Sequence, residues 1–189
     1  MQELNEIIAQ CKKQDTRAEY ALYQKCFTLL MPICYRYSTN RDDALDLLNK
    51  GFLKILNNIS KYNNELAFSK WAKSILINSI IDEFRMNKKY RENQQVTDFS
   101  TFSSNEHPFD INKAEQKLSA EEVLTQIGKL PKMSKEVLNL YVFEGLSHKE
   151  ISLSLNISEG TSRWHLSNAR TLLKEKLSTI LSSLKMLVL

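Results

Sequence analysis

Residues 133–177 read MSKEVLNLYVFEGLSHKEISLSLNISEGTSRWHLSNARTLLKEKL, and this stretch predicts two short helices separated by a tight turn. Gly145 follows a helical run and suits the left-handed backbone position that ends many helices. Ser147 is placed to cap the next helix, and Glu150, three residues later, completes the pattern of a capping box. The sequence therefore marks where one helix ends and where the next begins.

The second helix of the pair is expected after a turn at Asn156 and Ile157, with Ser158 as its cap. Two short helices with such a connection form the geometry that places the second helix in the major groove of DNA. One face of this helix repeats at helical spacing and is expected to pack on the core: Ser162, Leu166, Ala169, Leu173 and Leu177.

The opposite face and the beginning of the same helix are polar and basic. A simpler interpretation is an amphipathic helix whose charged side meets solvent, but caps, turn and basic stripe occur together here, which favours DNA binding. The sequence leaves two alternatives open for His165, a contact with a phosphate or no contact with DNA. For Trp164 the alternative to DNA binding is packing on a neighbouring helix. The expected DNA-binding residues are Ser158, Glu159, Gly160, Thr161, Arg163, Trp164, Ser167, Arg170 and Lys174.

The rest of the chain also predicts helices. Its 189 residues include 4 Gly and 3 Pro, too few for the tight turns of an all-β fold. We therefore expect an all-α protein with two small helical domains. Apolar residues at helical spacing predict helices near 3–13, 17–37, 41–57, 68–88, 115–128, 132–143, 148–155 and 159–183.

Charge is distributed unevenly along the chain, although the net charge is +4. Residues 68–91 carry a net charge of +4, residues 92–128 carry −5 and residues 129–176 carry +3. The acidic segment begins with a stretch rich in Ser, Asn, Asp and Thr that lacks helical periodicity, which is typical of a linker. The predicted division is a first domain at 1–91, an acidic linker at 92–112 and a second domain at 113–189.

Several kinds of site are not supported by the residues. Cys11, Cys26 and Cys34 form no CxxC pair, and we expect reduced, packed thiols rather than a redox sensor. The histidines show no metal-ligand or catalytic-triad spacing, so no metal or other cofactor is expected. The N-terminus lacks the order of a signal peptide, and no stretch approaches the roughly 18 apolar residues that span a bilayer. These features predict a cytoplasmic protein.

The C-terminal half resembles the second domain, region 4, of extracytoplasmic-function (ECF) sigma factors, which belong to the sigma-70 family and direct bacterial RNA polymerase to promoters. In that family the helix-turn-helix of region 4 recognises the −35 element. The residues that carry this resemblance, in order, are Leu130-Pro131, Glu136-Val137-Leu138, Glu144-Gly145-Leu146-Ser147, Glu150-Ile151, Ile157-Ser158, Gly160-Thr161, Leu166 and Ala169-Arg170.

The N-terminal half resembles region 2 of the same family independently. Many regulators share a helix-turn-helix, but the two halves in this order and at this spacing are specific. The pattern of the polymerase-gripping helix matches at Asp43-Ala44, Asp46-Leu47-Leu48 and Gly51-Phe52. The pattern of the helix that melts DNA matches at Phe68, Trp71, Ile75, Asn78, Asp82 and Arg85.

The resemblance implies that the first domain recognises the −10 element and opens the duplex. Basic grooves with aromatic surfaces hold single strands, and loop 60–67 lies where relatives form a pocket for a flipped base. For Phe68 and Trp71 the alternative to DNA binding is packing in the core. For Lys88 and Lys89 the alternative is a helix end that faces solvent. The implied residues are Lys61, Tyr62, Asn63, Asn64, Phe68, Lys70, Lys73, Asn78, Arg85, Lys88 and Lys89.

The resemblance also implies core RNA polymerase as a partner, through the clamp of its β′ subunit and through its β flap. Relatives usually carry acidic residues where this chain has Leu45 and Lys50, so its helix complements a basic clamp less fully. The implied polymerase-binding residues are Asp42, Asp43, Asp46, Leu47, Asn49, Lys50 and Phe52.

The acidic linker and an anti-sigma factor complete the implied interactions. The linker, with Phe99, Phe102 and Phe109, either docks in the positively charged channels of the polymerase or is a flexible acidic tether. An anti-sigma factor that masks the polymerase or DNA surfaces is a further implied partner. No small-molecule substrate is expected.

Three functional hypotheses follow. The leading one is a transcription initiation factor without catalytic activity of its own. The second is a regulator that binds duplex DNA alone, but such proteins usually bind as symmetric dimers, and this chain has a monomer's two-domain layout. The third is an enzyme acting on nucleic acid, which needs clustered carboxylates or a phosphate-binding glycine loop, and neither pattern occurs.

Overall fold

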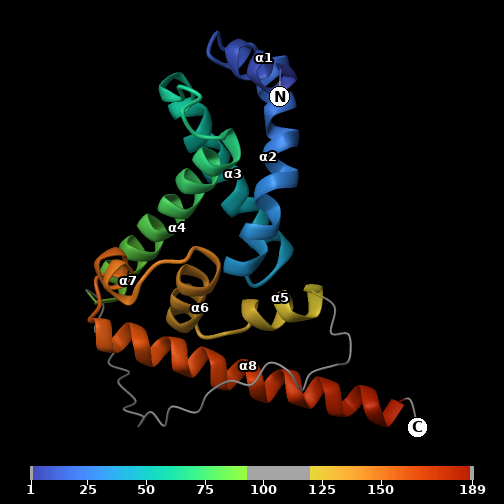
Figure 1. The fold of residues 1–189 in the computed structure, drawn as a ribbon, viewed down its shortest axis with the longest axis vertical. Helices are drawn as coiled ribbons and strands as arrows, with labels where there is room; N and C mark the ends of the chain where they lie inside the picture. The colour runs from blue at the N-terminus through green and yellow to red at the C-terminus, as the bar shows by residue number, and fades with distance from the viewer. Residues whose placement is uncertain (1, 93–119, 188–189) are drawn as a thin grey trace. The chain divides into compact units, whose positions relative to one another are not determined.

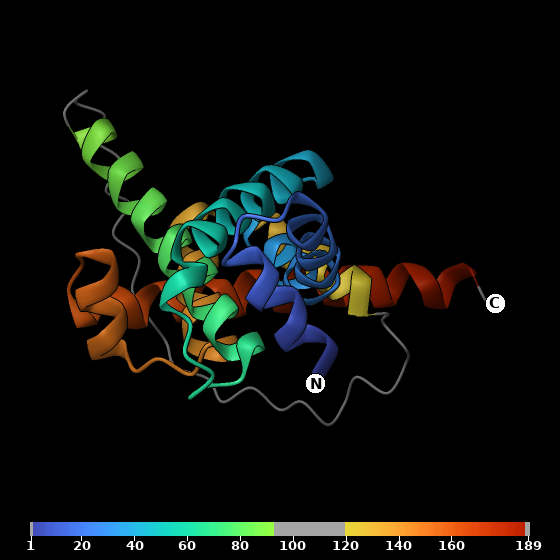
Figure 2. The same ribbon diagram turned by 90° about the horizontal axis from the view of Figure 1, so that it is seen from above.

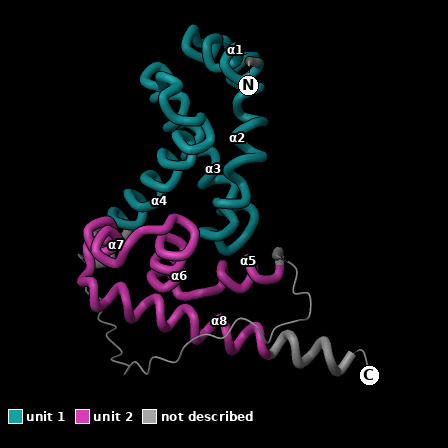
Figure 3. Tube along the Cα trace, viewed as in Figure 1, with its two compact units in different colours: residues 1–88 teal, residues 89–189 magenta. Residues whose placement is uncertain are grey.

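The computed structural model describes residues 2–92 and 120–187, which belong to two compact units, residues 1–88 and residues 89–189 (Figure 3). No strand occurs in these described ranges, and the predicted all-α fold is confirmed. The elements, labelled in Figure 1, are α1 (Gln2–Cys11), α2 (Thr16–Tyr37), α3 (Arg41–Asn58), the 3-10 helix η1 (Ile59–Lys61), α4 (Phe68–Glu92), α5 (Ala120–Gly128), α6 (Lys132–Leu138), the π-helical turn η3 (Asn139–Phe143), α7 (His148–Leu155) and α8 (Glu159–Leu187).

Several helix boundaries differ from the expected ones, including the end of α8, which lies at Leu187 rather than near residue 183. α1 ends at Cys11, followed by a turn in which Gln14 has a φ of 61°. α4 continues to Glu92, the first residue assigned to the linker, and residues 93–112 lie outside the described ranges. The segment expected as one helix over 132–143 is α-helical at first and then widens into η3, where the Glu144 amide donates to the Asn139 carbonyl at 3.2 Å.

Unit 1 is a helical bundle whose core lies between α2, α3 and α4. Leu22, Leu48 and Leu76, one from each of these helices, are fully buried. Gly51 of α3 faces Leu76 of α4 so closely that a Cβ atom added at Gly51 would lie 2.6 Å from Leu76 Cδ1. The missing side chain therefore lets α3 and α4 approach each other, and this approach sets the relative position of their outward faces.

Unit 2 buries the apolar faces of α6, α7 and α8 against one another. Leu140, Ile151 and Leu155 are almost completely buried, as are Leu166 and Ala169 of α8, which packs on both α6 and α7. Figure 2 shows that the later part of α8 continues beyond the other helices of this unit. The first turns of α8 thus combine a packed inner face with an open outer one.

Three further observations concern the classes of site considered from the sequence. No helix in the described ranges is long and apolar enough to cross a membrane. Within the same ranges no group of three or more His, Cys, Asp or Glu side chains is arranged to hold a metal ion. The three cysteines are free and buried, and burial raises the pKa of Cys11 to about 11 and the pKa values of Cys26 and Cys34 to about 12. They are the packed, protonated thiols expected from the sequence.

Candidate nucleic-acid interface

The first helix of the helix-turn-helix is fixed at its beginning by the predicted capping box. Gly145 has a φ of 72°, which places the chain to turn into α7. The Ser147 amide donates to Glu150 Oε2 at 2.8 Å, and the Glu150 amide donates to Ser147 Oγ at 3.2 Å. The hydrogen bond from the Ser147 hydroxyl to the Glu150 carboxylate, and then that from the Ser147 amide, lower the pKa of Glu150. The capping box predicted from the sequence is confirmed.

The turn that follows is also the predicted one. Asn156 has a φ of 52°, a left-handed conformation that asparagine tolerates better than most residues. The Thr161 amide then donates to Ser158 Oγ at 3.0 Å, which caps α8, and the two hydroxyl groups lie 2.8 Å apart. The hydroxyls of Ser158 and Thr161 therefore serve the cap, and a contact with DNA has to share them.

The faces of α8 divide as the sequence predicts. Ser162, Leu166 and Ala169 are buried, whereas Leu173 and Leu177 are half-buried. Arg163 is exposed on the outer face, and its guanidinium lies 3.0 Å from the Glu159 carboxylate one turn earlier. Among the remaining expected DNA-binding residues, Trp164 and Ser167 are half-buried and the exposed ones are Gly160, Thr161, Arg170 and Lys174.

A polar cluster that sequence reasoning missed joins η3, α7 and α8. The rings of Tyr141 and His148 stack with centroids 4.7 Å apart, and His148 Nδ1 lies 2.9 Å from the buried Ser162 Oγ. The Arg170 guanidinium carbon lies 5.9 Å from the centre of the Tyr141 ring. Burial, with the positive charge of Arg163, lowers the pKa of His148. This cluster places the Arg170 side chain of the outer face of α8 beside the Tyr141 ring.

His165 is turned away from the role of a phosphate ligand. Its Nδ1 lies 3.0 Å from Ser134 Oγ of α6, and Asn168 Nδ2 donates to the same hydroxyl at 3.2 Å. Burial lowers the pKa of His165 to about 4, so the ring is neutral near pH 7. Trp164 packs edge-on against this ring at a centroid distance of 4.7 Å. His165 therefore belongs to the packing of α8 on α6.

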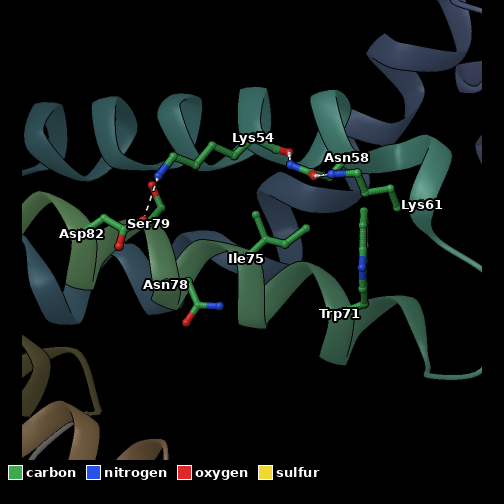
Figure 4. Close-up of a pocket in the computed structure, with 8 residues that line it drawn as sticks. All are labelled: Lys54, Asn58, Lys61, Trp71, Ile75, Asn78, Ser79 and Asp82. Carbon is green, nitrogen blue, oxygen red and sulfur yellow. Dashed lines mark hydrogen bonds and ion pairs between the residues drawn. The ribbon is translucent and has the colours of Figure 1, made fainter. Parts of the chain in front are cut away.

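In unit 1 a groove of about 280 Å³ lies between α3 and α4 (Figure 4). Trp71 stands at one end, Asp82 at the other, and Ile75 lies between them on α4. The polar residues at its rim can donate and accept hydrogen bonds, and two of them are lysines. Its lining residues are Lys54, Asn58, Lys61, Trp71, Ile75, Asn78, Ser79 and Asp82.

The polar side chains at both ends of the groove already have partners within the groove. Lys54 Nζ lies 3.5 Å from Asp82 Oδ2, so this end of the groove is closed by an ion pair between α3 and α4. Lys61 Nζ donates to Asn58 Oδ1 at 3.1 Å, and Asn58 Nδ2 donates to the Lys54 carbonyl at 2.9 Å. Because all three side chains are half-buried or exposed, water or a ligand can compete for these contacts.

The aromatic wall of the groove is a cluster of three rings. The centroid of the Trp71 ring lies 5.0 Å from that of Tyr62 and 5.7 Å from that of Phe68. Tyr62 and Phe68 are 5% and 6% exposed, and the Tyr62 hydroxyl donates to the Leu66 carbonyl at 2.8 Å. Tyr62 and Phe68 are therefore core groups in this arrangement, which is the alternative that the sequence left open for Phe68, and their rings hold the half-buried Trp71 in place.

The other expected −10 residues with described side chains do not line this groove. Asn63 and Asn64 are exposed on the loop before α4, and Asn64 has a φ of 64°. Lys70 and Arg85 are exposed on α4, and Lys73 is half-buried. The side chains of Lys88 and Lys89 lie outside the described residues.

Sequence reasoning included Lys61 among the DNA-binding residues but not Lys54 and Asn58, which line the α3 side of the groove. Lys54, Asn58 and Lys61 follow one another at four- and three-residue spacing, which places them on one helical face. That spacing was visible in the sequence. What the sequence does not show is that this face lies beside Trp71 and Asp82 of another helix.

The residues implied in polymerase binding lie along α3. Asp42, Asp43, Asp46 and Asn49 are exposed and Leu47 is half-buried. Phe52, in contrast, is 9% exposed. Its ring packs edge-on against Tyr23 at a centroid distance of 5.1 Å, and its implied contact with polymerase stays a prediction.

Lys50 changes the charge of this face. Its Nζ lies 2.7 Å from Asp46 Oδ2 and 3.4 Å from Glu83 Oε1, so one lysine bridges an acid of α3 and an acid of α4. The hydrogen bond to Asp46 raises the pKa of Lys50. The bridge neutralises part of the acidic surface that the sequence indicates for binding a basic partner.

Both units match known protein families. Residues 22–90 match the family described as Sigma-70 region 2, and residues 120–173 match Sigma-70, region 4. RNA polymerase sigma factor SigZ of Bacillus subtilis is 31% identical over 132 residues, covering 70% of this chain and 71% of that protein. ECF RNA polymerase sigma-E factor of Haemophilus influenzae is 22% identical over 181 residues, covering 93% and 95%.

Solved structures of related proteins include a sigma factor RpoE in complex with the anti-sigma factor NepR from Bartonella quintana. It is 21% identical and covers 82% of this chain and 96% of its own, with a TM-score of 0.46.

Proposed function

This chain belongs to the ECF sigma factors of the sigma-70 family, and we propose that its two units hold a promoter at two separate points. As a sigma factor, it directs promoter-specific initiation of transcription. In this proposal region 2 spans 1–91, region 4 spans 113–189 and 92–112 link them. The observation that carries the proposal is that one unit presents a capped recognition helix and the other a groove with an aromatic wall.

Region 4 binds duplex DNA at the −35 element through the beginning of α8. Arg163 is the residue best placed to pair with a guanine or a phosphate, because it is exposed in the second turn of the helix. Arg170 and Lys174 lie two and three turns further along the same face and contact the phosphate backbone. The free amides in the first turn of α8 add a partial positive charge directed at the same DNA.

Region 2 holds an unpaired base of the −10 element in the groove between α3 and α4. The Trp71 ring offers a stacking surface, and base–aromatic stacking contributes about 1–3 kcal/mol per base. Asn78, exposed on α4, supplies both a donor and an acceptor to a base edge. Lys54 and Lys61 contact the phosphates on either side by exchanging their protein partners for the ligand.

The exposed acids of α3 bind the β′ clamp of core RNA polymerase, and region 4 binds the β flap. Asp42 and Asp46 are the central contacts, with Asn49 beside them. A basic partner has to compete with Lys50 for Asp46. An anti-sigma factor that covers one of these surfaces is part of the same proposal, as are a cytoplasmic location and the absence of catalytic activity in this chain.

Reconstitution with core RNA polymerase tests the proposal. The full-length chain should bind core polymerase and start transcription at particular promoters. Replacing Arg163 with alanine should weaken promoter binding by about 1–3 kcal/mol, roughly 5- to 150-fold, without weakening the binding of core polymerase. Arg17→Ala, at an exposed position of α2, removes the same charge from the other unit and is the matched control.

Two results would contradict the proposal. Failure to bind core polymerase at low salt would remove the sigma function, and tight binding to a duplex operator without polymerase would favour a conventional regulator. Equal loss of promoter binding and core binding in Arg163→Ala would reject the DNA role of Arg163.

A further inference from the structure

The loop over residues 60–67 determines where the aromatic end of the groove lies. It carries Lys61, which lines the groove, and Tyr62, whose ring packs against Trp71. Two hydrogen bonds shape the loop from within: the Tyr62 amide donates to the Ile59 carbonyl at 3.2 Å, and the Tyr62 hydroxyl donates to the Leu66 carbonyl at 2.8 Å. Any displacement of Tyr62 therefore moves both the lysine and the stacking surface of the groove.

A third hydrogen bond holds this loop from a distant part of the chain. Lys12 Nζ donates to the Tyr62 carbonyl at 2.7 Å, although the two residues are 50 positions apart. A hydrogen bond from a charged donor is stronger than one between neutral groups, and a carbonyl at the end of a helical turn carries partial negative charge. Tyr62 is the residue that ends η1, so its carbonyl is one of those without a partner inside the helix.

The position of Lys12 is itself set by the corner between α1 and α2. The Asp15 amide donates to the Gln10 carbonyl at 3.2 Å around Gln14, whose φ is 61°. Asp15 then caps α2, because its Oδ1 accepts from the Ala18 amide at 2.8 Å. The corner is thus fixed to the end of one helix and to the beginning of the next. Only the side chain of Lys12 has to be ordered for its ammonium group to reach Tyr62.

We propose that Lys12 is a positioning residue for the promoter-melting groove, acting through the carbonyl of Tyr62. It lies ahead of the residues that match region 2 and outside every site assigned above. This inference rests on the proposed function of the groove. Lys12 does not contact the base in this mechanism; it holds the loop so that Trp71 and Lys61 keep the spacing that an unpaired nucleotide requires.

Lys13 provides a matched control for this mechanism. It is also exposed and carries the same charge at the adjacent position. If Lys12 acted by its positive charge alone, Lys12→Met and Lys13→Met would weaken DNA binding to a similar degree. If it acts through the hydrogen bond, Lys12→Met has the larger effect and Lys12→Arg, which keeps donors, restores part of the loss.

The test combines two measurements on the full-length chain. In the free protein, hydrogen exchange followed by mass spectrometry should show the amides of 60–67 exchanging roughly three- to tenfold faster in Lys12→Met. With core polymerase, on a promoter selected with the wild-type protein, permanganate reactivity of unpaired thymines should report opening slowed by a similar factor. Binding of core polymerase should not change.

The possible outcomes separate this inference from the proposed function. Unchanged exchange in Lys12→Met, unchanged opening despite faster exchange, or an equal defect in Lys13→Met would each overturn the positioning role. An absence of opening with the wild-type protein would instead overturn the proposed function, and with it the inference. Faster exchange and slower opening confined to Lys12→Met, with partial recovery in Lys12→Arg, support it.

Discussion

The helix-turn-helix of unit 2 and the groove of unit 1 are both helical, but contacts of different range position their functional side chains. In the helix-turn-helix the capping box, the cap of α8 and the ion pair of Arg163 join residues three or four positions apart. In unit 1 the ion pair between Lys50 and Glu83 spans 33 positions, and the bond between Lys12 and Tyr62 spans 50.

The difference in range has a physical consequence. A capping box forms as soon as its own helix forms, so the recognition helix carries much of its geometry in its local sequence. The groove exists only while α3 and α4 are packed together, because its two walls come from different helices. Changes to the packing of unit 1 should therefore affect the groove far more than equivalent changes affect the helix-turn-helix.

The largest expected effect comes from removing Leu76, which is fully buried between α3 and α4. Leu76→Ala should destabilise unit 1 by about 2–5 kcal/mol, because buried leucine loses its contacts and leaves a cavity. Denaturant unfolding followed by Trp71 fluorescence, in a Trp164→Phe background, measures this change. Equal destabilisation of the helices of unit 2 would break the comparison, because it would show that the two units unfold together.

The effect of Gly51→Ala on the stability of unit 1 should change sign when Leu76 is replaced by alanine, which provides a control. In the wild-type background Gly51→Ala should be destabilising, because overpacking against Leu76 costs about 1–3 kcal/mol and the gain in helix propensity is about 1 kcal/mol. In the Leu76→Ala background the close contact is gone, so the same substitution should stabilise unit 1 by up to about 1 kcal/mol. Destabilisation in both backgrounds would mean that Gly51 has a different role.

His165 tests a long-range polar contact of α8, which reaches Ser134 across 31 positions. Burial lowers the pKa of His165 from 6.5 to about 4. The unfolded chain therefore binds a proton at His165 below about pH 6.5, whereas the folded chain binds it only below about pH 4. Stability should therefore fall as the pH drops through this window, by less than about 3 kcal/mol in total because solvent screens the half-buried ring.

The measurement is the free energy of unfolding of unit 2 between pH 4 and pH 7.5, compared with His165→Gln. The variant should lose stability less steeply, and the lowered pKa of His148 should account for part of the slope that remains. Parallel curves for the two proteins would show that His165 is protonated equally in the folded and unfolded chains.

A smaller effect is expected at the local contacts of the helix-turn-helix. Ser147→Ala removes the cap of α7 and should destabilise unit 2 by about 1 kcal/mol. Ser152→Ala, within the same helix, removes a hydroxyl that serves no cap and should be close to neutral. Thermal unfolding of both variants checks this, and a loss at Ser147 as large as that at Leu76 would contradict the view that this motif relies on many weak local contacts.

The same distinction explains what the sequence could predict. The ends of α7, the turn at Asn156 and the cap at Ser158 were predicted correctly, because each depends on residues close together in the chain. The burial of Tyr62 and Phe52 was not predicted, because an aromatic side chain on a helix or loop can face the core or solvent. The stack of Tyr141 on His148 likewise depends on how two helices meet.

The smallest expected change in stability is at Glu159, whose exposed ion pair with Arg163 should contribute less than about 0.5 kcal/mol. Glu159→Gln should nevertheless increase affinity for duplex DNA of random sequence a few-fold, because it frees Arg163 and removes a negative charge that faces phosphates. Glu175→Gln removes the same charge farther along α8 and should have less effect. Fluorescence anisotropy at several salt concentrations measures both. Weaker binding by Glu159→Gln would mean that Glu159 orients Arg163 toward DNA, and the local contacts of the helix-turn-helix would then determine affinity as well as shape.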